Sequence, residues 1–344
     1  MIFSTKTLIE STNNQLFNKQ EKSLNINRSF FLESLELISE DQKIFRALMS
    51  NYYSNNIINE GSVSDLLKLM IKKIDVKKII LNIIKGFMDI LDKLWNRFNA
   101  FMLDYLGKNN VIKHYKSKLE KLNEPVEYGE SRFIFTNLGS SISYTSFKNE
   151  LDKEYSSLIL SLAKLHDFKN YEQLFSDIEN IKNDIDMSED YYNEVRGNIV
   201  GERNPIMKSE FPEALFKYFR NGGDPLPSGL ITSSEIKYAC NEYFDFNKKI
   251  KMIQKDKSDL KSAASKLQKD VMNINLENYI KDNIPSEAQN VFVKVLENKS
   301  KRIKETCELY LHVLSIKMDS VKEAYMQYTK ILMTASKHIA REGL

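Results

Sequence analysis

The sequence predicts a mainly α-helical protein: a helical bundle with a long antiparallel, coiled-coil-like helix hairpin at its C-terminal end and one small β-hairpin. Glycine and proline are scarce, at 11 and 6 of 344 residues, and they cluster at a few points. Between those points apolar residues recur at helical spacing, and residues suited to helix capping open the stretches. Only residues 131–147 alternate apolar and polar positions as a strand does.

The composition limits the classes of protein to consider. With 42% apolar and 28% charged residues, this is a soluble, core-forming composition. A net charge of +3 is too small to argue for a nucleic-acid partner by itself. Cys240 and Cys307 lie far apart with no partner histidine for a metal-binding pattern, so the sequence suggests neither a disulfide framework nor a zinc site and predicts reduced thiols. No apolar run has the length of a signal peptide or a membrane span.

The chain divides into four segments. Residues 1–61 are predicted to form a polar N-terminal arm or leader with a short helix, and residues 62–124 an amphipathic helical segment. Residues 125–230 are predicted to hold the β-hairpin and short helices, and residues 231–344 the long helix hairpin.

The helix hairpin follows from two heptad seams. A capping box of Thr232 and Glu235 opens the first, which runs for about forty residues with an interruption at Lys257. Pro285 lies in the break between the helices, and the second seam spans residues 303–339. Two helices joined by about ten residues fold back on each other. The seam residues expected to carry packing and subunit contacts are Ile250, Ile253, Leu260, Leu267, Leu314, Tyr325 and Leu332.

Residues 64–106 have a narrow polar stripe and are apolar around most of the remaining circumference. Such a helix is covered by neighbours on most sides, or it lies in a membrane interface with Trp95, Phe98 and Phe101 at headgroup depth. Trp95 and Phe98 are therefore further candidate interaction residues. The membrane interpretation predicts that this segment alone binds anionic liposomes.

Two loop-like stretches have structural interpretations. The predicted β-hairpin turns near Gly139, and its apolar positions are Phe133, Phe135, Leu138, Ile142 and Tyr144. Residues 210–232 hold three of the 11 glycines and three of the six prolines. We interpret this cluster as helix punctuation, with Pro212 in a first helical turn and Asn221, Gly222 and Gly223 ending that helix. The alternative is a functional loop.

The sequence holds no phosphate-binding glycine loop, dinucleotide fingerprint or paired-histidine zinc motif. The four histidines are dispersed. An acidic run at residues 177–190 lacks the glycine of a calcium loop, and residues 138–143, LGSSIS, lack the spacing of a nucleophile elbow. We therefore expect no catalytic residues, no metal, no cofactor and no enzymatic activity.

The layout resembles that of uncharacterised virion structural proteins, head or internal, of large tailed bacteriophages. The resemblance rests on the Asn-, Lys- and Ile-rich composition, the polar arm, the amphipathic helix, the long terminal helices and residues 191–223, YYNEVRGNIVGERNPIMKSEFPEALFKYFRNGG. It implies a protein present in many copies in the virion, and in the host cytoplasm during assembly. It also raises the question of whether a maturation protease trims the N-terminal arm.

The sequence thus favours a non-enzymatic structural or assembly protein whose long helices contact copies of itself or other virion proteins. One alternative is a membrane-active protein that uses residues 64–106. The other is an enzymatic or nucleic-acid-binding accessory factor, which predicts convergent polar groups in a pocket near residues 221–230.

Overall fold

A computed structural model describes residues 76–106, 110–140, 142, 144–165, 173–174, 176, 186–200, 207, 210–221, 224–274 and 288–343. By its internal contacts the chain splits into two units, Met1–Leu67 and Lys68–Leu344. The predicted N-terminal arm at residues 1–61 lies outside the described residues. So do Gly222, Gly223 and Pro285.

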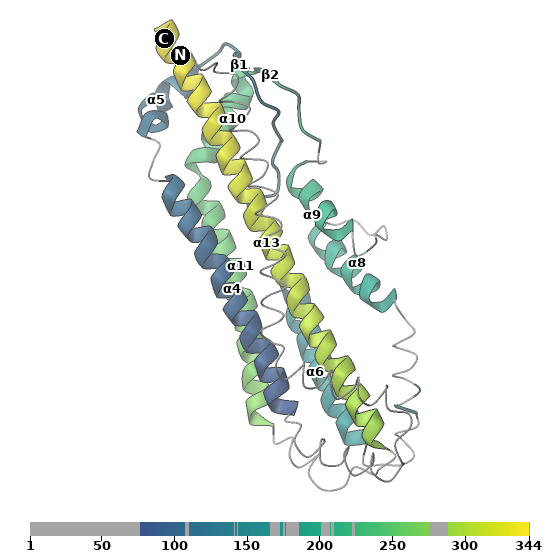
Figure 1. Cartoon of the computed structure of the whole chain (residues 1–344). Coiled ribbons are helices and arrows are strands. Elements are labelled where there is room, and N and C mark those ends of the chain that lie inside the picture. Colours follow the sequence, from purple (N-terminus) through teal and green to yellow (C-terminus); the bar gives the residue numbers. More distant parts are fainter. Residues whose placement is uncertain are drawn as a thin grey trace, which may run out of the picture. The chain divides into compact units, whose positions relative to one another are not determined.

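The described part is mainly helical with one small two-stranded antiparallel sheet, which confirms the predicted fold class (Figure 1). Its elements in chain order are α4 (Val76–Leu106), α5 (Asn110–Lys121), β1 (Val126–Tyr128), α6 (Thr145–Lys164), α8 (Asp186–Val200), α9 (Phe211–Phe219), β2 (Gly229–Ile231), α10 (Ser233–Phe244), α11 (Phe246–Asn273) and α13 (Gln289–Glu342).

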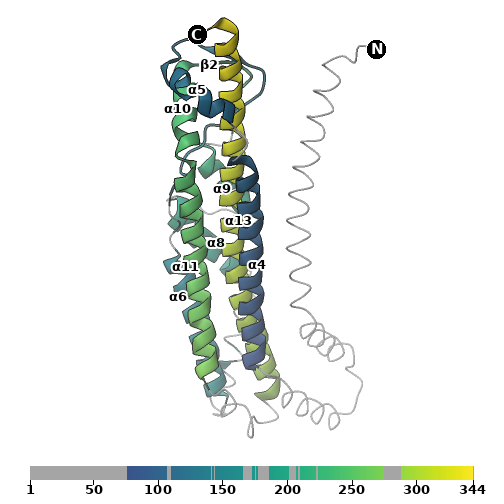
Figure 2. The same ribbon diagram turned by 90° about the vertical axis from the view of Figure 1, so that its left-hand side faces the viewer.

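Helix α13 is the centre of the unit Lys68–Leu344. Its 54 residues span about 80 Å at 1.5 Å per residue. It packs against α4, α5, α6, α9, α10, α11 and β1. The views in Figures 1 and 2 both show α4 and α11 running lengthwise beside it. The segments at residues 62–124, 125–230 and 231–344 therefore all contribute to one bundle.

The predicted second seam is buried along its whole length in α13. Its residues are Ile303, Cys307, Tyr310, Leu314, Met318, Val321, Tyr325, Tyr328, Leu332, Ala335 and Ile339. Buried residues also follow one another directly, as in Leu309–Leu311 and Ile316–Met318, which a single two-helix seam does not produce. Helix α13 is therefore the core of a bundle rather than one half of an isolated hairpin.

The predicted first helix is divided at Asp245 into α10 and α11. The capping box of Thr232 and Glu235 is present at the start of α10, as predicted. Just after the interruption Lys249 is buried instead of the predicted Ile250, whereas Phe246 and Ile253 on either side are buried as predicted. Lys249 retains a partner because its Nζ atom lies 2.7 Å from the Glu242 carboxylate.

The two strands lie elsewhere than the sequence predicted. Strand β1 pairs with β2, about a hundred residues away, with Val126 opposite Ile231. An isolated bridge between Arg132 and Leu226 extends this ribbon. The described residues of 131–147 form no hairpin with one another. The alternating pattern was correct in that Phe135, Leu138, Ile142 and Tyr144 are buried, but the partners of the segment come from other elements.

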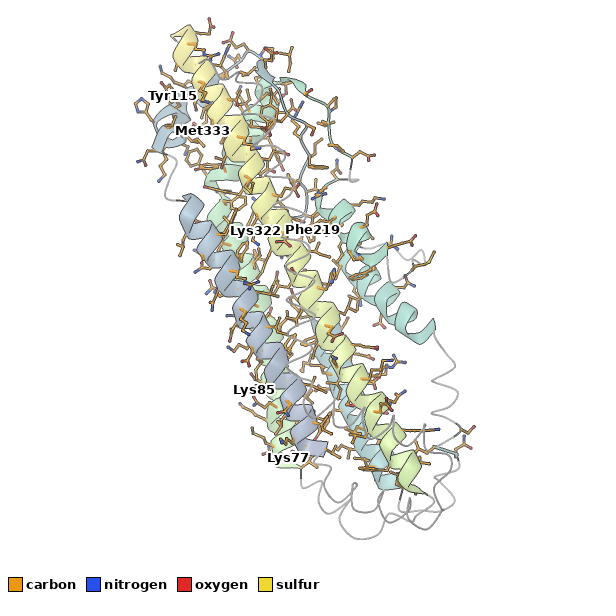
Figure 3. The ribbon with its side chains drawn as sticks, viewed as in Figure 1. Lys77, Lys85, Tyr115, Phe219, Lys322 and Met333 are labelled. Atoms are coloured by element: carbon orange, nitrogen blue, oxygen red, sulfur yellow. The ribbon has the colours of Figure 1, made fainter. Side chains whose placement is uncertain are left out.

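Helix α9 bears out part of the punctuation interpretation. Pro212 lies in its first turn, and the helix ends at Phe219, which lies beside α13 (Figure 3). Asn221 follows with a positive φ of 42°. The backbone therefore takes the left-handed conformation just after the helix end, as helix termination commonly requires.

The burial of α13 leads to a stability prediction. We expect Leu314→Ala to lower the free energy of unfolding by about 2–5 kcal/mol, because this side chain is fully buried and its removal leaves a cavity. The control is Leu160→Ala on α6, where the side chain is 63% exposed and the expected change is within about 0.5 kcal/mol. Urea unfolding followed by circular dichroism measures both, and equal midpoints would contradict the fold.

Candidate functional site

The segment at residues 129–140, here called the strap, runs along α13 without regular secondary structure and is held by polar contacts along its length. At its first end the backbone N–H of Arg132 donates to the Leu226 carbonyl at 3.0 Å, and the Leu226 N–H donates back at 2.7 Å. The Arg132 guanidinium also donates to Glu235 at 2.8 and 3.0 Å and to the Pro227 carbonyl at 3.0 Å. Arg132 thus ties the strap to the residues just before β2 and to α10.

The next anchor is the side chain of Gln327 on α13. It hydrogen-bonds to the strap backbone as a neighbouring β-strand would. The Phe133 N–H donates to Gln327 Oε1 at 2.7 Å, and Gln327 Nε2 donates to the Phe133 carbonyl at 2.7 Å. A primary amide offers one acceptor and one donor group, so it can satisfy both backbone groups of one residue. Two residues on, the Tyr238 hydroxyl donates to the Phe135 carbonyl at 3.1 Å.

The far end of the strap rests on α9 and α13. The Thr136 N–H donates to the Phe219 carbonyl at 2.9 Å, and the Asn137 side chain donates to the Tyr218 carbonyl at 3.2 Å. Asn137 has a positive φ of 58°, and the Ser140 N–H donates back to its carbonyl at 2.9 Å in a turn. The Ser140 carbonyl then accepts from Lys317 Nζ at 2.7 Å.

Lys317 belongs to a buried ion pair. Its ammonium group contacts the carboxylate of Asp256 on α11, and both side chains are 0% exposed. Burial lowers the pKa of Lys317 and raises the pKa of Asp256, and in each case the charge of the partner opposes the shift. Removal of either charge alone would leave the other buried without a counter-charge. The pair therefore joins α11, α13 and the strap at one point.

The carboxyl of Glu235 serves two roles at the opposite end of the strap. It accepts from the Thr232 N–H at 2.7 Å in the capping box and from Arg132. Burial favours the neutral acid, but the hydrogen bonds from Thr232 and Arg132 outweigh it and hold the pKa of Glu235 below its ordinary value. The group is therefore ionised at neutral pH, as the contact with Arg132 requires.

A pocket of about 300 Å³ lies between the strap, α10 and α13. Its walls are mainly aromatic and aliphatic, and its polar side chains include Arg132, Glu235 and Gln327 of the strap anchors. The lining residues include Phe133, Ile134, Phe135, Tyr238, Tyr328 and Ile331.

A second, polar groove of about 690 Å³ runs between α8, α9 and the strap and includes Asn221. The accessory-factor interpretation expected convergent polar groups near residues 221–230, and of that range the lining of this groove includes Asn221 alone. Its charged groups are of both signs, with Lys217 Nζ 2.9 Å from Glu213 and with Arg196 and Glu210 nearby.

Seven of the nine predicted interaction residues lie inside the bundle. Those fully or almost fully buried are Ile253, Leu260, Leu267, Leu314, Tyr325, Leu332 and Phe98. Ile250 and Trp95 are half-buried, and Lys257 Nζ lies 5.7 Å from the Trp95 ring centre. The seven buried residues pack within one chain, whereas Ile250 and Trp95 keep part of their surface accessible.

The apolar face of α4 also packs inside the bundle. The helix packs against α11 and α13, and Phe98 is 0% exposed rather than at the surface. At its first turn Lys77 Nζ donates to the Met272 carbonyl of α11 at 2.6 Å (Figure 3). Within the part of the chain that the structure describes, no helix is both long and apolar enough to cross a bilayer.

The strap anchors Arg132, Glu235, Asp256, Lys317 and Gln327 were not predicted as site residues. Asp256 carried a signal, since it lies three residues after Ile253 and four before Leu260, at a seam position. The sequence around Arg132 and Gln327 gave no signal of their role, because their partners are distant in sequence.

The described residues offer little for metal or thiol chemistry. Among them, no cluster of three or more His, Cys, Asp or Glu side chains is placed to hold a metal ion. Cys240 and Cys307 are free and buried, and burial raises the pKa of the Cys240 thiol to about 11. That thiol is therefore protonated at neutral pH.

Comparisons of this chain with known protein families, with well-described proteins and with solved structures found no match.

The buried ion pair can be tested with a double-mutant cycle. We expect Lys317→Met to lower the free energy of unfolding by about 3–5 kcal/mol, because Asp256 is left buried and unpaired, and we expect added Asp256→Leu to restore most of the loss. Urea unfolding measures each variant. As a control, Lys330→Met breaks the half-exposed Lys330–Glu130 pair and should cost at most about 1 kcal/mol. A double variant as unstable as the sum of the singles would contradict the pairing.

The Gln327 anchor makes a local prediction. Gln327→Leu leaves the N–H and C=O of Phe133 without partners, so we expect a loss of about 1–3 kcal/mol and faster hydrogen exchange at the Phe133 amide. Gln327→Glu is the matched control, because its carboxylate still accepts from that N–H. Amide-resolved exchange distinguishes them, and unchanged exchange in Gln327→Leu would show that the anchor is not formed.

Proposed function

We propose that this protein is a non-enzymatic structural protein that assembles with copies of itself or with other virion proteins. The observation that carries the proposal is the 54-residue helix α13, covered by helices of its own chain. A helix about 80 Å long that is already covered makes a prebuilt rod, which suits a spacer or building block better than a compact catalytic domain.

Such a rod meets its partners through its outer surface. The large apolar side chains with the greatest exposure on the described surface include Leu103 on α4 and Leu160 on α6, at 64% and 63%. We assign subunit contact to such outward-facing residues instead of to the seam residues, since the seams are used within the chain.

The placement in a virion rests on the resemblance of the layout and of residues 191–223 to structural proteins of large tailed bacteriophages. In the fold this block contributes to α8 and α9, which pack against each other, and α9 packs against α13. We propose that the chain is made in the host cytoplasm and incorporated into the virion.

The proposal predicts assembly of the purified full chain. Light scattering over a range of concentrations should give a defined oligomer, or a mass that rises with concentration above the 40.1 kDa of one chain. Leu103→Lys with Leu160→Lys should weaken this association at least about tenfold, because two charges would enter an apolar contact. The control Asn96→Lys adds a charge to an exposed polar position of α4. A 40.1 kDa species at every concentration would contradict self-assembly.

A further inference from the structure

The walls of the pocket of about 300 Å³ beneath the strap come mainly from three separate parts of the chain, with Leu226 as a further lining residue. Phe133, Ile134 and Phe135 come from the strap, Tyr238 and Ala239 from α10, and Tyr328 and Ile331 from α13. Phe135 and Tyr238 each lie 6.2 Å, centre to centre, from the Tyr328 ring in edge-on geometry. Aromatic rings therefore meet at the pocket from all three parts.

The charged and amide side chains of the lining are engaged with other groups of the lining, whereas the buried Tyr328 hydroxyl has no hydrogen-bond partner among the described residues. Arg132 is neutralised by Glu235, Gln327 is bonded to both backbone groups of Phe133, and the Tyr238 hydroxyl donates to the Phe135 carbonyl. The pocket thus presents no net charge, and a charged ligand would gain no counter-charge on losing its water. An uncharged, mainly apolar ligand has no such penalty.

The size and the opening of the pocket further limit the class of ligand that it could bind. Apolar cavities of about 150 Å³ already bind a single benzene ring, so about 300 Å³ accommodates one ring or two fused rings. Ile134 and Tyr238 line the pocket and are each 45% exposed, which gives a ligand access from solvent. The small side chain of Ala239 is part of the wall on α10.

We propose that this pocket is a binding site for an uncharged aromatic group of one or two fused rings, free in solution or carried on another chain. The aromatic walls favour edge-on and offset contacts with such a ring. The site does not depend on the proposed assembly function, and its test uses the full chain.

The first experiment is a saturation-transfer NMR titration with two probes, indole for a free ring and N-acetyltryptophanamide for a ring carried on a chain. We expect saturable binding of indole with a millimolar or lower Kd. Binding of both probes indicates that a chain-borne ring fits, and binding of indole alone indicates a free ligand. No saturable binding of either probe up to about 5 mM overturns the proposal.

Two variants locate the site. Ile134→Lys places a charge at the opening and should weaken indole binding at least about tenfold. The matched control is Val111→Lys on α5, a β-branched side chain that is 44% exposed and does not line the pocket. Ala239→Leu should also abolish binding by filling the cavity, with circular dichroism showing whether it folds. If Ile134→Lys and Val111→Lys bind indole equally, the pocket is not the site.

Discussion

The constraint on which this fold depends is that α13 carries buried residues on several of its sides. A helix with one apolar stripe needs one partner, whereas a helix that is apolar around most of its circumference must be surrounded. The chain surrounds α13 with elements that precede it in the sequence, from α4 to α11. Three tyrosines of α13, Tyr310, Tyr325 and Tyr328, each contact aromatic rings from other elements.

Within that apolar environment Lys317 fixes the alignment of its neighbours. If α11 were displaced by one helical turn along α13, the ammonium group would lose Asp256 and stay buried, a state that costs several kcal/mol. The same ammonium group donates to the Ser140 carbonyl, and this hydrogen bond fixes the position of Ser140 relative to α13. A polar contact thus selects one register among packings that apolar contacts alone would tolerate.

Periodicity predicts which face of a helix is buried, and it correctly predicted the buried face of α13. It could not show how many helices surround that face, since Leu314 is apolar whether it meets one partner or several. Alternation likewise identified the inward residues of the strap, such as Phe135 and Leu138, but assigned the pairing to a local hairpin. The true partners, Gln327 and Leu226, are defined only by the three-dimensional arrangement, and so is the pocket that they enclose.

The anchors of the strap join residues that are far apart in the chain: Phe133 and Gln327 are 194 positions apart, and Ser140 and Lys317 are 177 apart. Closing loops of this length costs entropy before the contacts form, and such topologies fold slowly. Moreover, α13 follows all of its partners in sequence, so on the ribosome α4 and the strap are made long before the helix that covers them. We expect the bundle to close only once α13 has been made, and its earlier helices to depend until then on whatever shields their apolar faces.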